Sequence, residues 1–285
     1  MGLERIFKTI KKYKLIKSKD KIFVGVSGGK DSLVALYSLK KYAEENNIRA
    51  EITAFHINLG FSFSQKIEEI VKKQAKEVGV KLVILRLKHM EINILKISRK
   101  KRRPICSVCG LAKRYLLNRV PRELGASKIA TGHNMDDFLS FFFKNLINKN
   151  LLWSSKFKPF LASDHPKLLP KIRPLFFTSE EESREIAKKS GLPILTYREI
   201  CPYAKTSTKS KWFKFLACID ENTKRQMIES ISEMEFESVK KGGIRECKVC
   251  GEPTNQEVCG FCRTFGIKDG IELAKKIKES INAYG

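Results

Sequence analysis

Four apolar runs rich in β-branched residues alternate with stretches that repeat apolar residues every three or four positions. The runs predict buried strands over residues 21–26, 50–57, 80–87 and 127–131. The stretches predict helices over residues 32–42, 64–78, 106–124 and 134–148. Strands that alternate with helices of this length predict an α/β fold, in which a twisted, mostly parallel sheet of about five strands is covered on both faces. Ligands on such sheets bind beyond the carboxyl ends of the strands.

The second half of the chain has a looser pattern, because prolines interrupt it repeatedly between residues 150 and 178. Helices are predicted over 179–190, over most of 211–237 and over 269–283. The Lys-Lys-Gly-Gly stretch at 240–243 is the best candidate linker. We therefore expect an N-terminal helix in residues 1–20, a large domain over 21–240 and a small module over 241–285.

The chain is strongly basic. Its 285 residues hold 56 Lys and Arg against 31 Asp and Glu, a formal charge of +25. A charge of this size indicates a polyanionic partner, although solvated lysine faces would also account for part of it. No apolar run approaches the roughly 18 residues of a membrane span, and residues 1–19 lack the apolar block of a signal peptide. We expect a cytoplasmic protein without a membrane partner.

A glycine-rich loop follows the first predicted strand and opens the first long helix. It consists of Ser27, Gly28, Gly29, Lys30, Asp31 and Ser32. Its glycines allow a close backbone approach to phosphate oxygens, the helix N-terminus favours an anion, and Lys30 adds a full positive charge. Asp31 either caps the helix or holds Mg²⁺. The spacing differs from that of the Walker loop, and a plain glycine-rich turn is the structural alternative.

Four of the eight cysteines lie close together near the C-terminus. Cys247, Cys250, Cys259 and Cys262 form two Cys-x-x-Cys pairs separated by eight residues. Four thiolates complete a tetrahedral Zn²⁺ shell and leave no open position, so this spacing predicts a structural zinc site. A pair of disulfides is the alternative, and it is disfavoured in a reducing compartment.

The other four cysteines are spaced unevenly. Cys218 lies among apolar residues of a predicted helix, which favours a packed core cysteine. Cys106, Cys109 and Cys201 form an incomplete ligand set. Three thiolates would leave one iron of a [4Fe–4S] cluster open, and a second zinc site completed by another ligand is an equally good interpretation of the spacing. A persulfide mechanism on two cysteines is a third hypothesis.

Five motifs together resemble one family. They are the loop at 27–32, Cys106-Ser-Val-Cys109-Gly-Leu-Ala-Lys-Arg114, Gly132-His-Asn-Met-Asp-Asp137, Cys201-Pro-Tyr203 and the four-cysteine module. The first resembles the PP-loop of ATP pyrophosphatases, which cleave ATP between the α and β phosphates. Together they resemble the TtcA/TtuA family of tRNA thiolation enzymes, in the archaeal and eukaryotic-type 2-thiouridine synthetase branch, over nearly the whole chain. Two-finger members carry a cysteine-rich module before the PP-loop, and here no cysteine precedes Cys106.

The resemblance implies an ATP-dependent tRNA 2-thiolation enzyme of the PP-loop fold. It implies that Cys106, Cys109 and Cys201 hold a [4Fe–4S] cluster whose open iron carries sulfur. Lys113 would stabilise charge on the α-phosphate, and Asp137 would orient or deprotonate the attacking group; a surface lysine and a helix-capping aspartate are the alternatives. His56 closes the second predicted strand and Gly132 follows the fourth, so both would approach the nucleotide, although a packed histidine is as good an interpretation of His56.

Partners and competing functions complete the expectations. Residues 96–103 hold six basic residues and 205–214 interleaves lysines with Trp212 and Phe213, which suits an RNA backbone and a splayed base. The sulfur donor is inorganic sulfide or a thiocarboxylated ubiquitin-like carrier protein, and a homodimer is one open assembly. The competing hypotheses are 2-thiocytidine synthesis, a cluster-free PP-loop tRNA modification such as amine ligation, and a basic zinc-ribbon RNA-binding protein.

Overall fold

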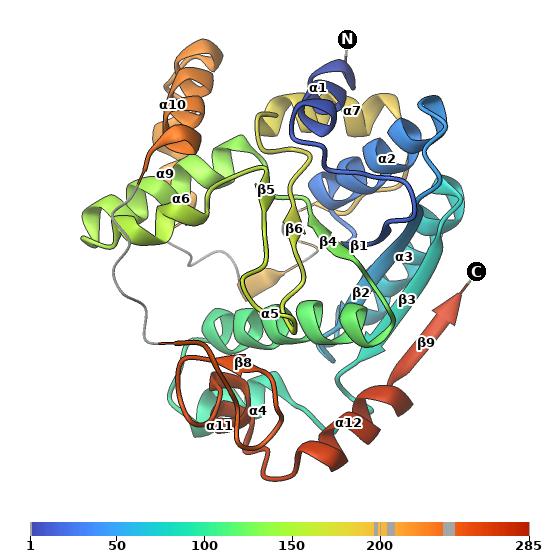
Figure 1. Ribbon diagram of the computed structural model, residues 1–285, viewed down its shortest axis with the longest axis vertical. Helices are drawn as coiled ribbons and strands as arrows, with labels where there is room; N and C mark the ends of the chain where they lie inside the picture. Colours follow the sequence, from blue (N-terminus) through green and yellow to red (C-terminus); the bar gives the residue numbers. More distant parts are fainter. Residues whose placement is uncertain (1, 197–198, 200, 204–208, 236–242, 285) are drawn as a thin grey trace.

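A seven-stranded sheet forms the centre of the computed structural model, which describes residues 2–196, 199, 201–203, 209–235 and 243–284 (Figure 1). The strand order is β5-β6-β4-β1-β2-β3-β9. The five inner strands from β6 to β3 are parallel, whereas β5 and β9 pair antiparallel at the two edges. The strands are β1 (Lys21–Gly25), β2 (Glu51–Asn58), β3 (Lys81–Arg86), β4 (Lys128–Thr131), β5 (Phe160–Leu161), β6 (Lys171–Ile172) and β9 (Ile281–Tyr284). The predicted α/β class with its parallel sheet is confirmed.

Helices cover both faces of the sheet, and further helices form a third apolar cluster. One face packs against α1 (Glu4–Lys12), α2 (Lys30–Glu45), α3 (Ser64–Val78) and α7 (Glu180–Lys189). The other face packs against α4 (Ile94–Lys100), α5 (Ile105–Glu123), α11 (Gly260–Phe265) and α12 (Gly270–Glu279). A third apolar cluster joins α6 (Met135–Ile147), the 3-10 helix η1 (Leu151–Lys156), α9 (Lys209–Leu216) and α10 (Glu221–Glu233). A small hairpin of β7 (Arg245–Glu246) and β8 (Pro253–Thr254) carries the first two cysteines of the C-terminal module.

Local sequence explains where several helices begin and end. α3 ends at Gly79, whose φ of +69° lies in the left-handed region that favours glycine. α7 begins with a capping box, in which the Ser179 side chain accepts from the Glu182 N–H and the Glu182 carboxylate accepts in return. No helix among the described residues is long and apolar enough to span a bilayer.

The end of the chain differs from the expectation of one closing helix over 269–283. α12 ends at Glu279, and Ile281–Tyr284 pairs antiparallel with β3, with Leu82 opposite Tyr284. The open edge of β3 offers unpaired backbone groups, and pairing with them outweighs the local helical tendency of the last residues. The C-terminal segment therefore completes the main sheet.

Two helices differ from the prediction, and one predicted segment cannot be compared with the structure. Residues 94–100 form a helix that we did not predict, because basic side chains hide a short apolar spacing. The predicted helix over 211–237 is broken at Asp220, whose side chain caps α10 by accepting from the Thr223 N–H. The candidate linker at 240–243 lies outside the described residues, apart from Gly243.

The prediction of a core cysteine at position 218 is wrong. Cys218 is exposed, because α9 ends at Leu216 and the chain then turns. Leu216 is the buried residue of this segment. An apolar neighbourhood in sequence does not make a residue beyond a helix end part of the core.

Candidate active site and metal centre

The loop at 27–32 connects the end of β1 to α2, as predicted. Gly28 has φ +82°, and a Cβ there would lie 3.2 Å from Leu195 and 3.3 Å from Ile67. The Ser32 hydroxyl donates to the Gly29 carbonyl at 3.0 Å and accepts from the Ser27 N–H at 3.1 Å. The loop is thus closed on itself, with the first N–H groups of α2 available for an anion.

Lys30 and Asp31 form an ion pair at the start of α2. The Lys30 Nζ lies 2.8 Å from Asp31 Oδ1 and 3.6 Å from a Glu180 carboxylate oxygen. Gly29 is the N-cap residue of α2, so Asp31 does not take the capping position. Its Oδ1 instead accepts from the Asn134 side-chain amide at 3.1 Å. The Asp31 carboxylate therefore lies between α2 and the loop after β4.

Gly132 brings the loop after β4 against the PP-loop backbone. A Cβ at position 132 would lie 2.6 Å from the Asp31 carbonyl oxygen and 2.7 Å from the Ser32 nitrogen. β4 and β1 are neighbours, and the sheet order reverses between them, which is where open α/β sheets bind ligands. Only glycine allows this contact between the two loops.

Asp137 takes part in a capping box at the start of α6. The Asn134 side chain accepts from the Asp137 N–H at 3.0 Å, and Asp137 Oδ2 accepts from the Asn134 N–H at 3.3 Å. Asp136 is buried beside it and pairs with Lys224 at 3.1 Å. Asp137 therefore has a structural role as a cap, and its place beside the two loops is compatible with the expected catalytic role as well.

Phe138 directly follows Asp137 in α6. The Arg173 guanidinium lies 4.8 Å over the Phe138 ring, and it donates to the carbonyls of Lys156 and Lys158. Burial lowers the pKa of Arg173 to about 10. A cation–π contact thus stabilises this buried cation.

Cys106, Cys109 and Lys113 share one face of α5, since they follow each other at spacings of three and four. Burial raises the pKa of the Cys109 thiol; the nearby Cys201 and Cys106 raise it further, and Lys113 opposes the shift. These electrostatic neighbours place Cys201 near the α5 cysteines, although it lies about 90 positions later in the chain. The structure therefore brings the three cysteines and Lys113 together.

Two contacts anchor the segment that carries Cys201. The Leu195 N–H donates to the Gly28 carbonyl at 2.9 Å, which ties the segment to the PP-loop. The Tyr203 ring packs on Phe61 and Phe63, at centroid distances of 5.6 and 6.3 Å. Cys201 lies between these anchors, which explains how a segment so distant in sequence reaches α5.

The three cysteines are not packed as closely as ligands of a single ion. In the part of the chain that the structure describes, one group of three or more His, Cys, Asp or Glu residues has ligand atoms that all lie within 4.8 Å of one another. It is the group of four cysteines near the C-terminus. A four-iron cluster is larger than one ion, so its ligand sulfurs stand farther apart. Cys106, Cys109 and Cys201 are not part of the C-terminal group.

His56 lies in β2 and is buried, with 5% of its surface exposed. Its Nδ1 lies 3.0 Å from the Val26 carbonyl, so Nδ1 carries the proton and donates. Its Nε2 is buried without a hydrogen-bond partner. Desolvation lowers the pKa of His56 to about 4, and the nearby Lys113 lowers it as well. The imidazole is therefore neutral and packed below the end of β1.

Burial of neutral His56 predicts a loss of stability in mild acid. The folded-state pKa of about 4 lies below the ordinary 6.5, so the unfolded chain takes up a proton first as the pH falls. The stabilisation is complete above pH 6.5 and is lost as the pH falls toward 4. We expect a fall of roughly 2 kcal/mol in unfolding free energy between pH 7 and pH 5. Urea titrations at both pH values check this, with His56→Gln as the matched variant. An equal fall in the variant would contradict the assignment.

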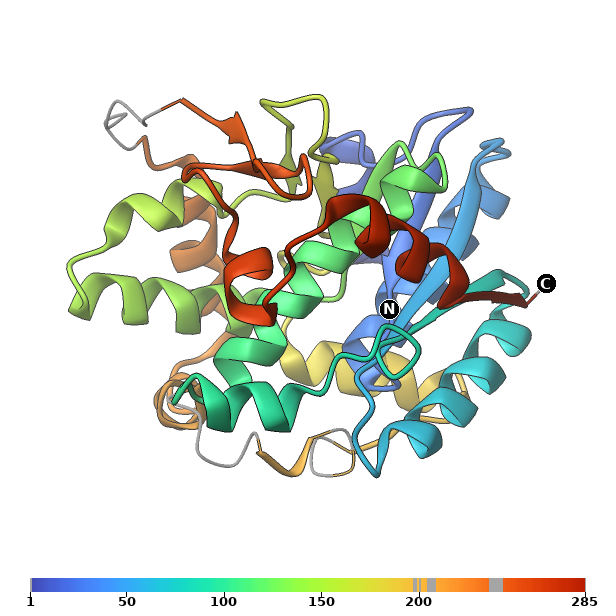
Figure 2. The same cartoon turned by 90° about the horizontal axis from the view of Figure 1, so that it is seen from below.

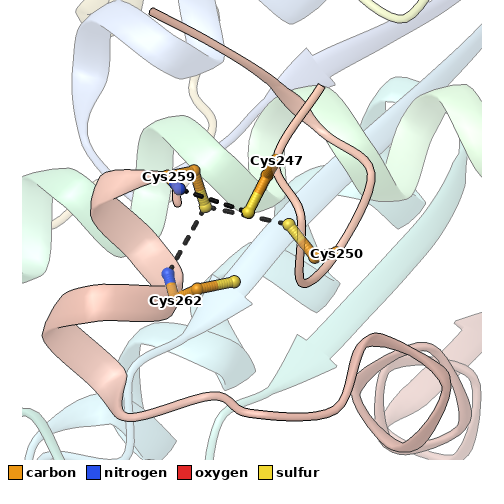
Figure 3. Close-up of side chains that lie close together, drawn as sticks. All are labelled: Cys247, Cys250, Cys259 and Cys262. Carbon is orange, nitrogen blue, oxygen red and sulfur yellow. Dashed lines mark hydrogen bonds between the residues drawn. The ribbon is translucent and has the colours of Figure 1, made fainter. Parts of the chain in front are cut away.

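The C-terminal module brings its four cysteines together (Figure 3). The Cys250 and Cys259 sulfurs are 3.7 Å apart, and the sulfurs of all four cysteines lie within 4.8 Å of one another. The Cys259 N–H donates to the Cys247 sulfur at 3.2 Å, and the Cys262 N–H donates to the Cys259 sulfur. Gly251 turns the first pair with φ +69°. Four converging sulfurs with N–H donors fit a tetrahedral metal ion, so the expected metal-capable group is confirmed.

Sequence reasoning missed several residues that hold the site together. Asn134, Leu195, Gln74 and Glu180 contact the PP-loop or its ion pair. Of these, only Asn134 belongs to a motif singled out in the sequence. The others are ordinary polar or apolar residues whose role depends on contacts across the fold.

Comparisons with known proteins agree with this architecture. The PP-loop domain family matches residues 3–196. The tRNA-5-methyluridine(54) 2-sulfurtransferase of Pyrococcus horikoshii is 38% identical over 94% of this chain and 86% of its own length. The enzyme of the same name from Thermotoga maritima is 35% identical over 91% of this chain and 85% of its own.

A solved structure shares the fold over nearly the whole chain. It is the U34-tRNA thiolase NcsA from Methanococcus maripaludis with its [4Fe–4S] cluster, which matches with a TM-score of 0.71 and 24% identity. The match covers 92% of this chain and 87% of that one. With the sequence matches and the PP-loop geometry, this places the chain in the TtcA/TtuA family of PP-loop tRNA thiolation enzymes.

Proposed function

We propose that this protein is an ATP-dependent tRNA 2-sulfurtransferase that converts a uridine to 2-thiouridine. One observation carries the proposal: the PP-loop and the group of Cys106, Cys109 and Cys201 share the carboxyl edge of the sheet. ATP activation and sulfur delivery need adjacent sites, because the activated base must be attacked before water reaches it. The Pyrococcus and Thermotoga relatives make 5-methyluridine at position 54 the first candidate target.

The first step adenylates the carbonyl oxygen at C2 of the base. The C2 oxygen attacks the α-phosphate, the bond between the α and β phosphates breaks, and pyrophosphate leaves. The N–H groups at the start of α2 and Lys30 would bind the departing pyrophosphate. Asp31, freed from Lys30 by the incoming phosphates, would hold Mg²⁺. Lys113 would stabilise negative charge on the α-phosphate, and Asp137 would orient the base.

The second step replaces the activated oxygen by sulfur. Sulfur attacks C2, the C2–O bond breaks, and AMP leaves with the former carbonyl oxygen. A [4Fe–4S] cluster held by Cys106, Cys109 and Cys201 would supply an open iron, a Lewis acid for hydrosulfide. The fit rests on the donor set: Cys106 and Cys109 lie in the first turns of α5, and Cys201 is an electrostatic neighbour of Cys109. His56 is neutral, so it adds no further positive charge beside Lys113.

The charge distribution supports tRNA as the partner. The basic segment 96–103 lies in α4 and the turn before Cys106, and Arg99, Lys100 and Arg102 are exposed there. Trp212 stacks on Phe143 at 5.6 Å beside exposed lysines of α9, which offers a further aromatic surface. The part of the tract at 204–208 lies outside the described residues. These features suit phosphate contacts and base stacking.

The remaining assignments complete the proposal. The C-terminal cysteines would hold Zn²⁺, because four thiolates leave it no open position. The sulfur would come from inorganic sulfide or from a thiocarboxylated ubiquitin-like carrier, and the enzyme would act in the cytoplasm, with a homodimer as one assembly.

Anaerobic protein incubated with tRNA, ATP, Mg²⁺ and sulfide tests the function. We expect AMP and 2-thiouridine to form in equal amounts, measured by nucleotide chromatography and by mass spectrometry of digested tRNA. Lys30→Ala is the control and should form neither product. A 2-thiocytidine product would redirect the assignment to cytidine. Binding of tRNA without any AMP formation would leave a basic zinc-ribbon RNA-binding protein instead.

A further inference from the structure

Helix α5 presents two opposite faces to two different sites. Cys106, Cys109 and Lys113 lie on one face. Leu111, Tyr115, Arg119 and Arg122, spaced by four, four and three residues, lie on the opposite face. Figure 2 shows the C-terminal segment running along this helix, and α11 contacts it directly. A rigid helix transmits any shift of one face to the other.

The outer face of α5 packs closely on the four-cysteine module. The Tyr115 ring stacks on Phe261 with centroids 3.9 Å apart and planes 7° from parallel. A Cβ on Gly260 would lie 3.5 Å from a Leu111 methyl, so backbone and side chain are in contact there. Both Phe261 and Gly260 lie between the ligands Cys259 and Cys262. The segment that carries the module's second pair of cysteines thus packs on α5.

A buried carboxylate joins the same helix to the first pair. Glu252, two residues after Cys250, accepts two hydrogen bonds from Arg122, at 2.5 and 2.9 Å. Arg119 lies 3.8 Å from the same carboxylate. Glu252 is almost fully buried and the Arg122 side chain is 20% exposed, so this bidentate contact is less screened by water than a surface ion pair.

A hydrogen-bond relay reaches a sulfur ligand itself. Arg119 donates from Nη1 to the Tyr115 hydroxyl oxygen at 2.6 Å. The Tyr115 hydroxyl is also an electrostatic neighbour of the Cys250 sulfur. Because Arg119 donates to the hydroxyl oxygen, the hydroxyl hydrogen remains available to a thiolate at Cys250. A metal-bound thiolate is a charged acceptor at a fixed position, and outer partners of this kind orient a ligand and strengthen the metal site.

We propose that Tyr115 is a positioning residue that couples metal loading of the C-terminal site to the placement of α5. With the metal bound, the relay, the stacked rings and Glu252 fix the helix that carries Cys106, Cys109 and Lys113. Without the metal, the two Cys-x-x-Cys pairs are no longer joined through one ion, and the support that they give to α5 weakens. By reciprocity, a fixed α5 must also favour metal binding. The coupling rests on metal binding by the four cysteines, and it does not require that the substrate be tRNA.

Tyr115→Phe tests the relay, because it keeps the stacked ring and removes only the hydroxyl. Anaerobic protein is first reconstituted with iron and sulfide so that the other cysteines are occupied. Zinc affinity is then measured by competition with a chromophoric chelator, and we expect a roughly 10- to 100-fold loss in the variant. Tyr37→Phe on α2, remote from the module, is the matched control and should bind zinc as the wild type does.

Hydrogen exchange measures the coupling directly. In the wild type, zinc should slow amide exchange along α5 as well as in the module. In Tyr115→Phe at saturating zinc, the slowing should be confined to the module. Unchanged zinc affinity in the variant, or an α5 response equal to that of the wild type, would overturn the proposal. A wild-type protein that binds no zinc at the four cysteines would instead refute the metal assignment.

Discussion

Replacing Cys109 or Cys201 by alanine is expected to abolish tRNA thiolation while the C-terminal metal stays bound. The two cysteines lie near Cys106 at the start of α5, and a cluster cannot be retained by two thiolates. Iron should fall from about four atoms per chain to none, and zinc should remain near one. Metal analysis by inductively coupled plasma spectrometry and the cluster's visible absorption measure both.

Two matched variants sharpen this prediction. Cys250→Ala should lose zinc and local stability while iron remains, since its sulfur belongs to the other group. Cys218→Ala should keep both metals and full activity, because this cysteine is exposed. Protein that carries two zinc ions and no iron, yet thiolates tRNA, would rule out the open-iron mechanism. A persulfide mechanism on Cys109 and Cys201 would then be the leading account.

Gly132→Ala should remove most ATP turnover without unfolding the protein. The new methyl group would lie 2.6 Å from the Asp31 carbonyl oxygen, so the PP-loop or the loop after β4 must shift. A displacement of about 1 Å of binding groups can lower a rate by roughly 100-fold. We expect a fall of about that size in AMP formation, with an overpacking cost of about 1–3 kcal/mol in stability.

Gly243→Ala is the control for this substitution. No heavy atom lies within 4 Å of a Cβ at position 243, and the residue is far along the chain from the PP-loop. Its AMP formation and urea midpoint should match those of the wild type. If Gly132→Ala forms AMP at the wild-type rate, the close contact between the two loops is not needed for catalysis.

Sites whose residues lie close together in the sequence could be predicted. The phosphate loop needs a strand, two glycines and a helix N-terminus in one short stretch, and these all appear between residues 21 and 45. The four-cysteine group depends on spacings of two and eight residues, which the chain also shows directly. Continuous apolar runs sufficed for β1, β2, β3 and β4, because a strand buried on both faces is continuously apolar. The two-residue parallel strand β6 was not predicted.

Long-range contacts could not be predicted in this way. Nothing near Leu195 in the sequence indicates that its N–H binds the Gly28 carbonyl, and nothing near Tyr115 indicates a sulfur partner 135 positions later. The pattern of residues 281–283 continues the predicted helix, and pairing with the open edge of β3 overrides it. Cys218 shows the converse case, since apolar neighbours in sequence did not bury it.

The pairing of β9 with β3 also affects how the chain folds. Leu82 and Tyr284 are 202 positions apart, so this ladder closes one of the longest loops in the molecule. Such contacts have a high entropic cost and form late, after the local helices and the inner strands. The last strand joins the four-cysteine module to the PP-loop sheet at its far edge, while α5 joins them near the middle. The buried residues of the module also belong to the apolar cluster of this face of the sheet. The two parts should therefore unfold in one cooperative transition.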